Sequence, residues 1–158
     1  MKIIVTGAIG HFGSYIIRDL GVFFPGSNIV MIDNMMTQRF PSLFNLPSHA
    51  NYRFIEGDVN QMNLRSVFVD ADVVIHLAAI TNAAESFQIK KKLIKNNFLS
   101  TKKIVDISKK KKIKCIFFSS TSVYGSSDKI MYEDDFKNLN PQSPYAECKI
   151  REEKYILK

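Results

Sequence analysis

The stretch Gly7-Ala8-Ile9-Gly10-His11-Phe12-Gly13 decides the fold, because it joins two segments whose hydrophobic residues recur with different periods. Before it, Lys2–Thr6 is a short run rich in β-branched residues, which is typical of a strand. After it, Phe12, Ile16 and Leu20 recur at the spacing of one helix face. The sequence here predicts a strand, a glycine-rich turn and a helix.

Each of the three glycines has a distinct use in a turn of this kind. One lets the chain turn tightly, another lets the backbone approach a pyrophosphate, and the last allows the helix to pack closely on the strand. The helix N-terminus then offers N–H groups and a positive dipole end to phosphates. Turns also collect glycine for steric reasons alone, so the position of the turn between strand and helix matters more than the glycines themselves.

Asp33 supports a dinucleotide as the ligand of this turn. It lies about 20 residues beyond Gly13, at the end of a second predicted strand, where a carboxylate can bind both ribose hydroxyls. Its negative charge disfavours a 2′-phosphate, so we expect NAD rather than NADP, although Arg39 lies close enough in sequence to weaken that preference. The alternative is that Asp33 simply forms the turn at the strand end.

Strands and helices alternate along the rest of the chain, which favours a parallel sheet with right-handed crossovers. We expect a Rossmann-like, doubly wound, three-layer α/β/α fold that forms one NAD(P)-binding domain over residues 1–158. The further strands are predicted at Asn28–Ile32, Tyr52–Ile55, Val73–Leu77 (a central strand) and Cys115–Phe118, and the further helices at a short segment capped by Asp58 or Asn60 and ending near Val69, at Ile89–Lys110, and from Ser143 onward.

Composition excludes several classes of protein. The 158 residues are 46% hydrophobic and 23% charged, and no apolar run reaches the ~20 residues of a membrane span. Cys115 and Cys148 are too few for a disulfide framework and lack metal-ligand spacing, so we expect a cytoplasmic protein without a metal. The net charge of +7 comes largely from lysine clusters at the two ends of one predicted helix, which favours solvated helix ends over nucleic-acid binding.

A tyrosine and a lysine form the candidate catalytic pair. Tyr145 and Lys149 are four residues apart and share one face of the last predicted helix. A free tyrosine has a pKa of about 10, so a nearby ammonium is needed to stabilise the phenolate at neutral pH. The hydroxyls of Ser119 to Ser122 follow the fifth predicted strand, at the sheet edge where doubly wound folds bind ligands. A solvated helix face and a polar turn are the alternatives for these two features.

Six motifs in order and register resemble the extended short-chain dehydrogenase/reductases. They are Thr6 to Gly13, Asp33-Asn34, Gly57-Asp58-Val59, His76 to Ala79, Ser119 to Gly125 and Pro144-Tyr145 to Lys149. Within that group the chain is similar to the NAD-dependent epimerase/dehydratase family, and most of all to sugar-nucleotide epimerases. The likeness covers essentially the whole chain, and it implies a UDP- or dTDP-sugar substrate.

The resemblance also implies a role for each site residue. Ser120 would bind the substrate oxygen, Tyr145 would be the acid/base, and Lys149 would bind the nicotinamide ribose. The hydride would pass to NAD while Tyr145 takes the proton, which gives a keto sugar that can be reduced from its other face. The cofactor positions would be Gly7, Gly10, His11, Phe12, Gly13, Asp33, Asn34, Asp58, Val59, Leu77, Ala78, Ala79, Thr81, Asn96 or Asn97, Tyr145 and Lys149.

Two departures from the family limit the expected activity. Dehydratases carry an acidic pair where this chain has Thr121 and Ser122, so epimerase ranks above dehydratase or reductase. Relatives also continue into a C-terminal substrate domain, which is missing here, so we expect a fragment with little activity alone. A non-catalytic NAD-binding module is the alternative. Relatives commonly dimerise through the helices that here begin near Ile89 and Ser143, which makes a homodimer possible, but the sequence leaves the oligomeric state open.

Overall fold

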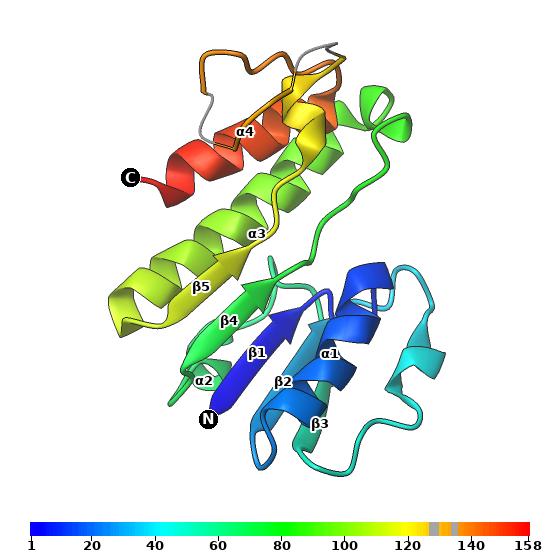
Figure 1. Cartoon of the computed structure of the whole chain (residues 1–158), viewed down its shortest axis with the longest axis vertical. Helices are drawn as coiled ribbons and strands as arrows, with labels where there is room; N and C mark the ends of the chain where they lie inside the picture. The colour runs from blue at the N-terminus through cyan, green and yellow to red at the C-terminus, as the bar shows by residue number, and fades with distance from the viewer. Residues whose placement is uncertain (127–129, 134–135) are drawn as a thin grey trace. The chain divides into compact units, whose positions relative to one another are not determined.

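A parallel sheet carries the first part of the structure, a computed structural model that describes residues 1–126, 130–133 and 136–158. Among these residues, five strands run in the order β3-β2-β1-β4-β5, and every neighbouring pair is parallel. Figure 1 shows β1 in the middle of this order. The strands are β1 (Lys2–Thr6), β2 (Asn28–Asp33), β3 (Asn51–Glu56), β4 (Val73–His76) and β5 (Lys114–Phe117). The predicted Rossmann-like α/β fold is thereby confirmed.

The strand order reverses direction next to β1. The chain first adds β2 and β3 on one side of β1, and then returns to add β4 and β5 on the other. Thr6 is in register with Ile32 of β2 and with His76 of β4, so all three strands end at one edge. Ligands of doubly wound sheets bind at such a switch point, outside the carboxyl ends of the strands.

The chain divides into two compact units. The first unit is Met1–Ala79 with Lys103–Phe118, which includes the whole sheet, and the second is Ile80–Lys102 with Ser119–Lys158. Helix α3 (Lys90–Lys111) contributes its first part to the second unit and its last part to the first.

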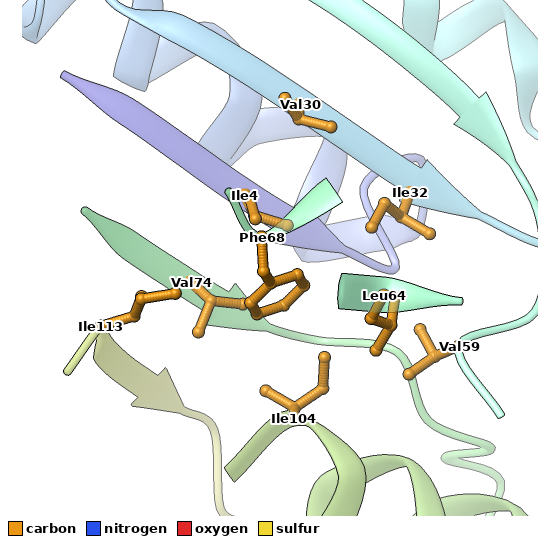
Figure 2. Packing of buried hydrophobic residues seen from close by; sticks show 9 residues of the cluster. All are labelled: Ile4, Val30, Ile32, Val59, Leu64, Phe68, Val74, Ile104 and Ile113. Atoms are coloured by element: carbon orange, nitrogen blue, oxygen red, sulfur yellow. The ribbon is translucent and has the colours of Figure 1, made fainter. Parts of the chain in front are cut away.

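Helices cover both faces of the sheet in the first unit. On one face, Ile17 of α1 (His11–Phe23) packs with Ile3, Val5 and Ile29. On the other face, Figure 2 shows Phe68 among side chains of β1, β4, α3 and the short helix α2 (Leu64–Val67). Full burial of such a side chain stabilises the fold by about 1.5–3 kcal/mol, so these two clusters hold the strand ends in place. The three-layer α/β/α arrangement is confirmed for this unit.

Some predicted details were wrong. The cap of α2 is Asn63, whose side chain accepts a hydrogen bond from Arg65 N, because Asp58 and Asn60 belong to the preceding turn. The buried face of α1 is Gly13, Ile17 and Gly21, whereas Phe12 is 66% exposed, because the helix turns its two glycines toward the sheet.

Strand positions also differ slightly from the prediction. β5 begins at Lys114 and ends at Phe117, one residue earlier than expected. β4 is an interior strand, as expected of an apolar run, but it lies between β1 and β5, and β1 holds the middle position.

The second unit is built mainly from helices. Helix α4 (Pro144–Ile156) begins where expected, because the Ser143 side chain accepts a hydrogen bond from Ala146 N and Pro144 occupies the first turn. Leu93 of α3 packs against Tyr145 and Cys148 of α4. Two 3-10 segments, η2 (Glu85–Phe87) and η3 (Thr121–Tyr124), complete it; a third such segment, η1 (Phe40–Leu43), lies in the first unit. None of the helices in the described ranges combines the length and hydropathy of a membrane span.

Candidate functional site

The glycine turn brings the backbone unusually close to the strand beside it. Gly7 has a φ of 68°, and a Cβ at this position would lie 2.7 Å from the backbone nitrogen of Ala78. A Cβ at Gly13 would overlap the carbonyl oxygen of Gly7. The turn therefore tolerates no side chain at either position, which agrees with the tight turn and the close helix packing predicted for a dinucleotide-binding turn.

The first turn of α1 presents backbone donors at this edge. Its N-cap is Gly10, and no side-chain hydrogen bond caps the helix. The first N–H groups of a helix have no partner within the helix, and they lie at its positive dipole end. His11 and Phe12 are both exposed at this position. The arrangement suits an anion such as a phosphate group.

Asp33 ties the end of β2 to the glycine turn. Its Oδ2 accepts a hydrogen bond from Ile9 N over 3.2 Å, and its Oδ1 accepts one from Met35 N over 2.9 Å. Burial raises the pKa of this carboxyl, and the hydrogen bonds from Met35, Ile9 and Asn34 oppose that rise. An ionised carboxylate has about four acceptor positions, and the three backbone donors leave about one of them for a hydroxyl donor. Asn34 beside it is exposed, and its Oδ1 accepts from Met36 N.

A hydrogen-bonded pair fixes the ends of β1 and β4. Thr6 Oγ1 lies 2.6 Å from His76 Nδ1, and the same oxygen accepts a 3.4 Å hydrogen bond from Ala78 N. The three residues that follow β4, Leu77 to Ala79, are half-buried. Three of the predicted cofactor positions are thus held beside the glycine turn, within the first unit.

Asp58 and Val59, two adjacent predicted cofactor positions, have side chains that are both engaged within the first unit. Asp58 Oδ1 accepts from Asn60 N over 2.8 Å, which makes a turn after β3. Val59 is only 4% exposed and packs in the core shown in Figure 2, so its side chain is committed to the core. Lys103 secures this turn, because its ammonium donates to the carbonyl oxygens of Val59, Asn60 and Met62.

Asn97 supports the loop after β4 rather than presenting a free amide. It is fully buried, its Oδ1 accepts from Ile80 N, and its Nδ2 donates to Ile80 O, both over 2.9 Å. A cofactor contact by the Asn97 side chain would break these two bonds. Asn96 donates to Asn97 Oδ1 and is half-buried, while Thr81 is exposed.

The second unit brings together the predicted catalytic hydroxyls. Ser120 caps η3, and its Oγ lies 2.8 Å from the Oγ of Ser122. Tyr145 is 9% exposed and shares a hydrogen bond with Ser120.

Lys149 lies on the same helix face as Tyr145, as predicted, but it has a partner that was not expected. Its ammonium nitrogen is 5.9 Å from the centre of the Tyr145 ring and 3.2 Å from Oε2 of Glu152. Glu152 is 1% exposed, and its Oε1 accepts from Thr101 Oγ1 over 2.6 Å.

The expected lowering of the Tyr145 pKa is absent from this structure. Burial raises the pKa of Tyr145, the hydrogen bond with Ser120 lowers it, and the negative charge of Glu152 and the thiol of Cys148 raise it. The ammonium of Lys149, 5.9 Å from the ring centre, does not reverse this balance. The phenol is therefore a proton donor at neutral pH in the unliganded protein.

Three residues of these arrangements were missed as site residues from the sequence: Thr101, Lys103 and Glu152. Glu152 follows Lys149 by three positions, a spacing at which helix side chains meet, so its pairing was open to prediction. Lys103 and Thr101 act on residues far away in sequence, and no local pattern marks such partners.

Comparisons with known proteins agree with this geometry. Residues 3–158 match the model of the NAD dependent epimerase/dehydratase family. The chain is 32% identical to dTDP-D-glucose 4,6-dehydratase of Dictyostelium discoideum, over 94% of this chain and 38% of the relative. It is 30% identical to UDP-glucose 4-epimerase of Pisum sativum, over 94% and 45%. The chain thus spans about half, or less, of the length of these relatives.

Solved structures give the same result. The UDP-N-acetylglucosamine 4-epimerase from Methanobrevibacter ruminantium M1, in complex with UDP-N-acetylmuramic acid, matches with a TM-score of 0.89 and 31% identity, over 99% of this chain and 49% of that one. The UDP-glucuronic acid 4-epimerase from Bacillus cereus, in complex with UDP-glucuronic acid and NAD, matches with a TM-score of 0.83 and 31% identity, over 98% and 51%. The parallel sheet, the glycine turn and the match over residues 3–158 lead to one conclusion: this chain belongs to the NAD-dependent epimerase/dehydratase family.

Proposed function

We propose that this chain is the NAD-binding and acid–base part of a sugar-nucleotide epimerase, and that residues 1–158 act as one NAD(P)-binding domain. The observation that carries the proposal is the Tyr145 phenol, which is hydrogen-bonded to Ser120 and lies on one helix face with Lys149. Membership of the family supports it, as do the names of the relatives, which are sugar-nucleotide epimerases and dehydratases.

The residues of the first unit fit NAD. A Cβ at Gly7 or Gly13 would clash with packed backbone, so both glycines are needed for the tight turn, and α1 begins without a side-chain cap at Gly10. Asp33 retains an acceptor position for a ribose hydroxyl, and its charge disfavours a 2′-phosphate. When bound, NAD supplies the acceptor for the hydride that leaves the sugar carbon.

The residues of the second unit would handle the substrate proton. Ser120 would donate or accept a hydrogen bond at the sugar hydroxyl, and Tyr145 would take the proton from that oxygen onto its own. Because the pKa of Tyr145 is raised in the unliganded protein, proton removal depends on groups that stabilise the phenolate, and Lys149, 5.9 Å from the ring centre, is such a cation. Lys149 would also bind the nicotinamide ribose.

The remaining assignments are proposals at the positions the sequence predicts. His11 and Phe12 would offer backbone donors to phosphate, and Leu77, Ala78 and Ala79 would line the cofactor. Asn97 would act indirectly, through Ile80, since its amide is already bonded. The other proposed cofactor positions are Asn34, Asp58, Val59, Thr81 and Asn96.

The residues after Ser120 favour epimerisation over dehydration. Elimination needs its own acid and base, and the two positions that follow carry Thr121 and Ser122, of which Ser122 is hydrogen-bonded to Ser120. Neither side chain titrates near neutral pH, so neither can serve as that pair.

A non-catalytic NAD-binding module is the second candidate, and one observation favours it. The Lys149 ammonium is paired with Glu152, and burial, with a further contribution from Glu152, raises the pKa of Tyr145 above its ordinary value. The two candidates differ in a simple way, because a module would bind NAD without needing the Tyr145 hydroxyl.

The proposed substrate is a UDP- or dTDP-sugar. Support comes from the relatives, one of which was solved with UDP-glucuronic acid and NAD. A homodimer and a cytoplasmic location complete the proposal; the thiols of Cys115 and Cys148 are both free, which suits a reducing compartment. Light scattering of the purified chain tests the dimer.

A titration followed by a single-turnover assay tests the function. The purified chain is titrated calorimetrically with NAD and with NADP, and UDP-glucose, UDP-N-acetylglucosamine and dTDP-glucose are then added in turn while absorbance at 340 nm is followed. We expect tighter binding of NAD than of NADP and a slow, weak rise in absorbance with one of the sugars. An absence of NAD binding would contradict the proposal, and rapid multiple turnover by the 158 residues would contradict the expected weak activity.

A further inference from the structure

A buried ion pair lies beside the proposed acid/base. The side chains of Lys149 and Glu152 are 6% and 1% exposed, and their charged atoms are 3.2 Å apart. The carboxylate also has a neutral anchor, because Thr101 Oγ1 of α3 donates to its Oε1 over 2.6 Å. The three residues therefore form a chain from α3 through Glu152 to the ammonium, all within the second unit.

This pair is expensive to bury. Removing two charges from water costs several kcal/mol per ion, and their attraction offsets this only when the geometry is good. Apolar residues of similar volume often stabilise a protein as well as such a pair does. A purely structural role would therefore not need two charges at this place, next to the Tyr145 ring.

The pair changes the charge that the Tyr145 phenol experiences. A lone ammonium 5.9 Å from the ring centre would favour the phenolate, whereas an ammonium paired with a carboxylate is nearly neutral at that distance. Consistent with this, the pKa of Tyr145 is raised first by burial, and Glu152 raises it further against the lowering by Ser120.

Other ionisable groups around α4 do not replace this pair. Within the described second unit, Lys149 and Glu152 are the charged residues that are buried. On α3, Lys90 is paired with Glu147 and Lys102 donates to the Tyr155 hydroxyl. The remaining titratable groups on the elements that pack around Tyr145 are Cys148, Arg151, Glu153 and Lys154 on α4, Glu85 on η2, Tyr124 on η3, and Lys91, Lys92 and Lys95 on the part of α3 in the second unit.

We infer that Glu152 is a positioning residue: its carboxylate, anchored by Thr101, holds the Lys149 ammonium and cancels much of that charge at Tyr145. The inference rests on the proposed function, in which Tyr145 is the acid/base. In the free protein Glu152 adds to the effect of burial in favouring the neutral phenol, and any ligand that draws Lys149 away from Glu152 increases the positive charge acting on the phenol.

The test is a titration of Tyr145 in the full 158-residue chain without ligand. Tyrosine is labelled with ¹³C at Cζ, and the Tyr145 signal is assigned by its loss in Tyr145→Phe. In Glu152→Gln we expect the Tyr145 midpoint to move to lower pH, because the negative charge is gone while the amide oxygen can still accept from Thr101. The matched control is Glu147→Gln on the same helix, because the half-exposed carboxylate of Glu147 pairs with Lys90. In this control the Tyr145 midpoint should stay at the wild-type value. An unchanged or raised midpoint in Glu152→Gln would overturn the inference.

A second comparison covers the case in which Glu152→Gln leaves an unpaired buried ammonium and fails to fold. Lys149→Gln is compared with the double variant Lys149→Gln/Glu152→Gln, which buries no charge beside Tyr145. Lys149→Gln keeps the Glu152 carboxylate but removes the ammonium that pairs with it. The Tyr145 midpoint should therefore be higher in Lys149→Gln than in the double variant. Equal midpoints would contradict the inference, and a thermal melt followed by circular dichroism verifies that each variant is folded.

The outcome is separable from that of the proposed function. Calorimetry with NAD on the wild-type chain decides whether the cofactor binds at all, and failure there rejects the proposed function whatever the tyrosine does. The tyrosine titration needs no cofactor. If NAD binds and the titration midpoint of Tyr145 is the same in wild type and in Glu152→Gln, only the positioning role of Glu152 is wrong.

Discussion

The Oδ2 atom of Asp33 accepts a hydrogen bond from the backbone N–H of Ile9 over 3.2 Å. This bond joins the end of β2 to the glycine turn that follows β1, so the proposed ribose-binding carboxylate and the proposed phosphate-binding backbone are positioned by each other. Oδ1 is held in the same way by Met35 N. The carboxylate is thus oriented before any ligand arrives, which reduces the entropy lost on binding.

Replacing Asp33 with asparagine tests this coupling. One side-chain oxygen becomes an NH₂ group that faces a backbone donor, and the negative charge that disfavours a 2′-phosphate is lost. We expect Asp33→Asn to weaken NAD binding about tenfold, or ~1.4 kcal/mol, and to reduce the preference for NAD over NADP, both measured calorimetrically. Asp72→Asn is the control, since the exposed Asp72 also accepts from a backbone N–H, that of Lys2. Unchanged discrimination in Asp33→Asn would reject the ribose role.

The pH dependence of NAD binding follows from the same carboxyl. Burial holds the pKa of Asp33 above its ordinary value, so the group becomes protonated at a higher pH than an exposed aspartate does. The charged form is the better acceptor for ribose hydroxyls, and NAD affinity should fall as pH is lowered through this raised pKa. Asp33→Asn should lack that acid-side fall in calorimetric titrations.

A side chain at Gly13 should disrupt the turn. A Cβ there would overlap the Gly7 carbonyl oxygen and lie 2.7 Å from the carbonyl carbon and oxygen of Ala8, and this packed backbone cannot move cheaply. Gly13→Val should lose NAD binding and destabilise the chain by about 1–3 kcal/mol, the usual cost of overpacking, as measured by denaturant unfolding. Gly26→Asn is the control, because a Cβ at Gly26 meets nothing within 4 Å and asparagine tolerates its φ of 76°. Normal NAD affinity in Gly13→Val would contradict the account of the turn.

The Tyr145 hydroxyl should matter for chemistry and not for cofactor affinity. Tyr145→Phe removes the group that exchanges a proton with the substrate but keeps the ring that packs against Leu93. We expect the 340 nm signal with sugar nucleotide to disappear, while NAD affinity stays within about twofold of wild type, a difference of ~0.4 kcal/mol. Retention of the signal would favour a module in which this tyrosine has no chemical role.

Alkaline pH should act on stability through Cys148. Burial, with the nearby Glu152 charge, raises the pKa of the Cys148 thiol from 9.0 to about 12. Because the folded pKa lies above the unfolded one, the stability from this group is fully present below about pH 9 and is lost as pH rises toward 12. The difference in free energy of unfolding between wild type and Cys148→Ala should therefore shrink from pH 8 to pH 10.

A second truncation in the same cluster controls for the Cys148 measurement. Ile94 packs beside Leu93, Tyr145 and Cys148 and carries no titratable group. The decrease in free energy of unfolding caused by Ile94→Val should be the same at pH 8 and at pH 10. If the difference in free energy of unfolding between wild type and Cys148→Ala is also independent of pH, the thiol titrates normally.

Much of the fold was predictable because local patterns govern it. The glycine turn, the β-branched runs and the lysine-rich end of α3 each carry their signal within a few residues, and alternation of strands and helices favours parallel order. Capping was less predictable: several polar residues follow β3, and tertiary packing of Leu64 and Phe68 selects Asn63 as the cap of α2.

The site was predictable in identity but not in its electrostatics. Motif spacing indicated Ser120, Tyr145 and Lys149, and the structure brings these three together in one unit. The raised pKa of Tyr145 depends on burial and on Glu152, and the anchor of Glu152 is Thr101, 51 positions away in sequence. Contacts of that range arise from helix packing, which no local pattern encodes.

The central claim, that a dinucleotide binds at the glycine turn, is tested most directly by an amide chemical-shift titration of the ¹⁵N-labelled chain with NAD. We predict saturable changes concentrated in the N–H signals of residues 7–13 and 33–34, with NADP producing weaker changes at the same concentrations. If those signals stay unmoved at saturating NAD while changes occur elsewhere, or nowhere, the claim is contradicted.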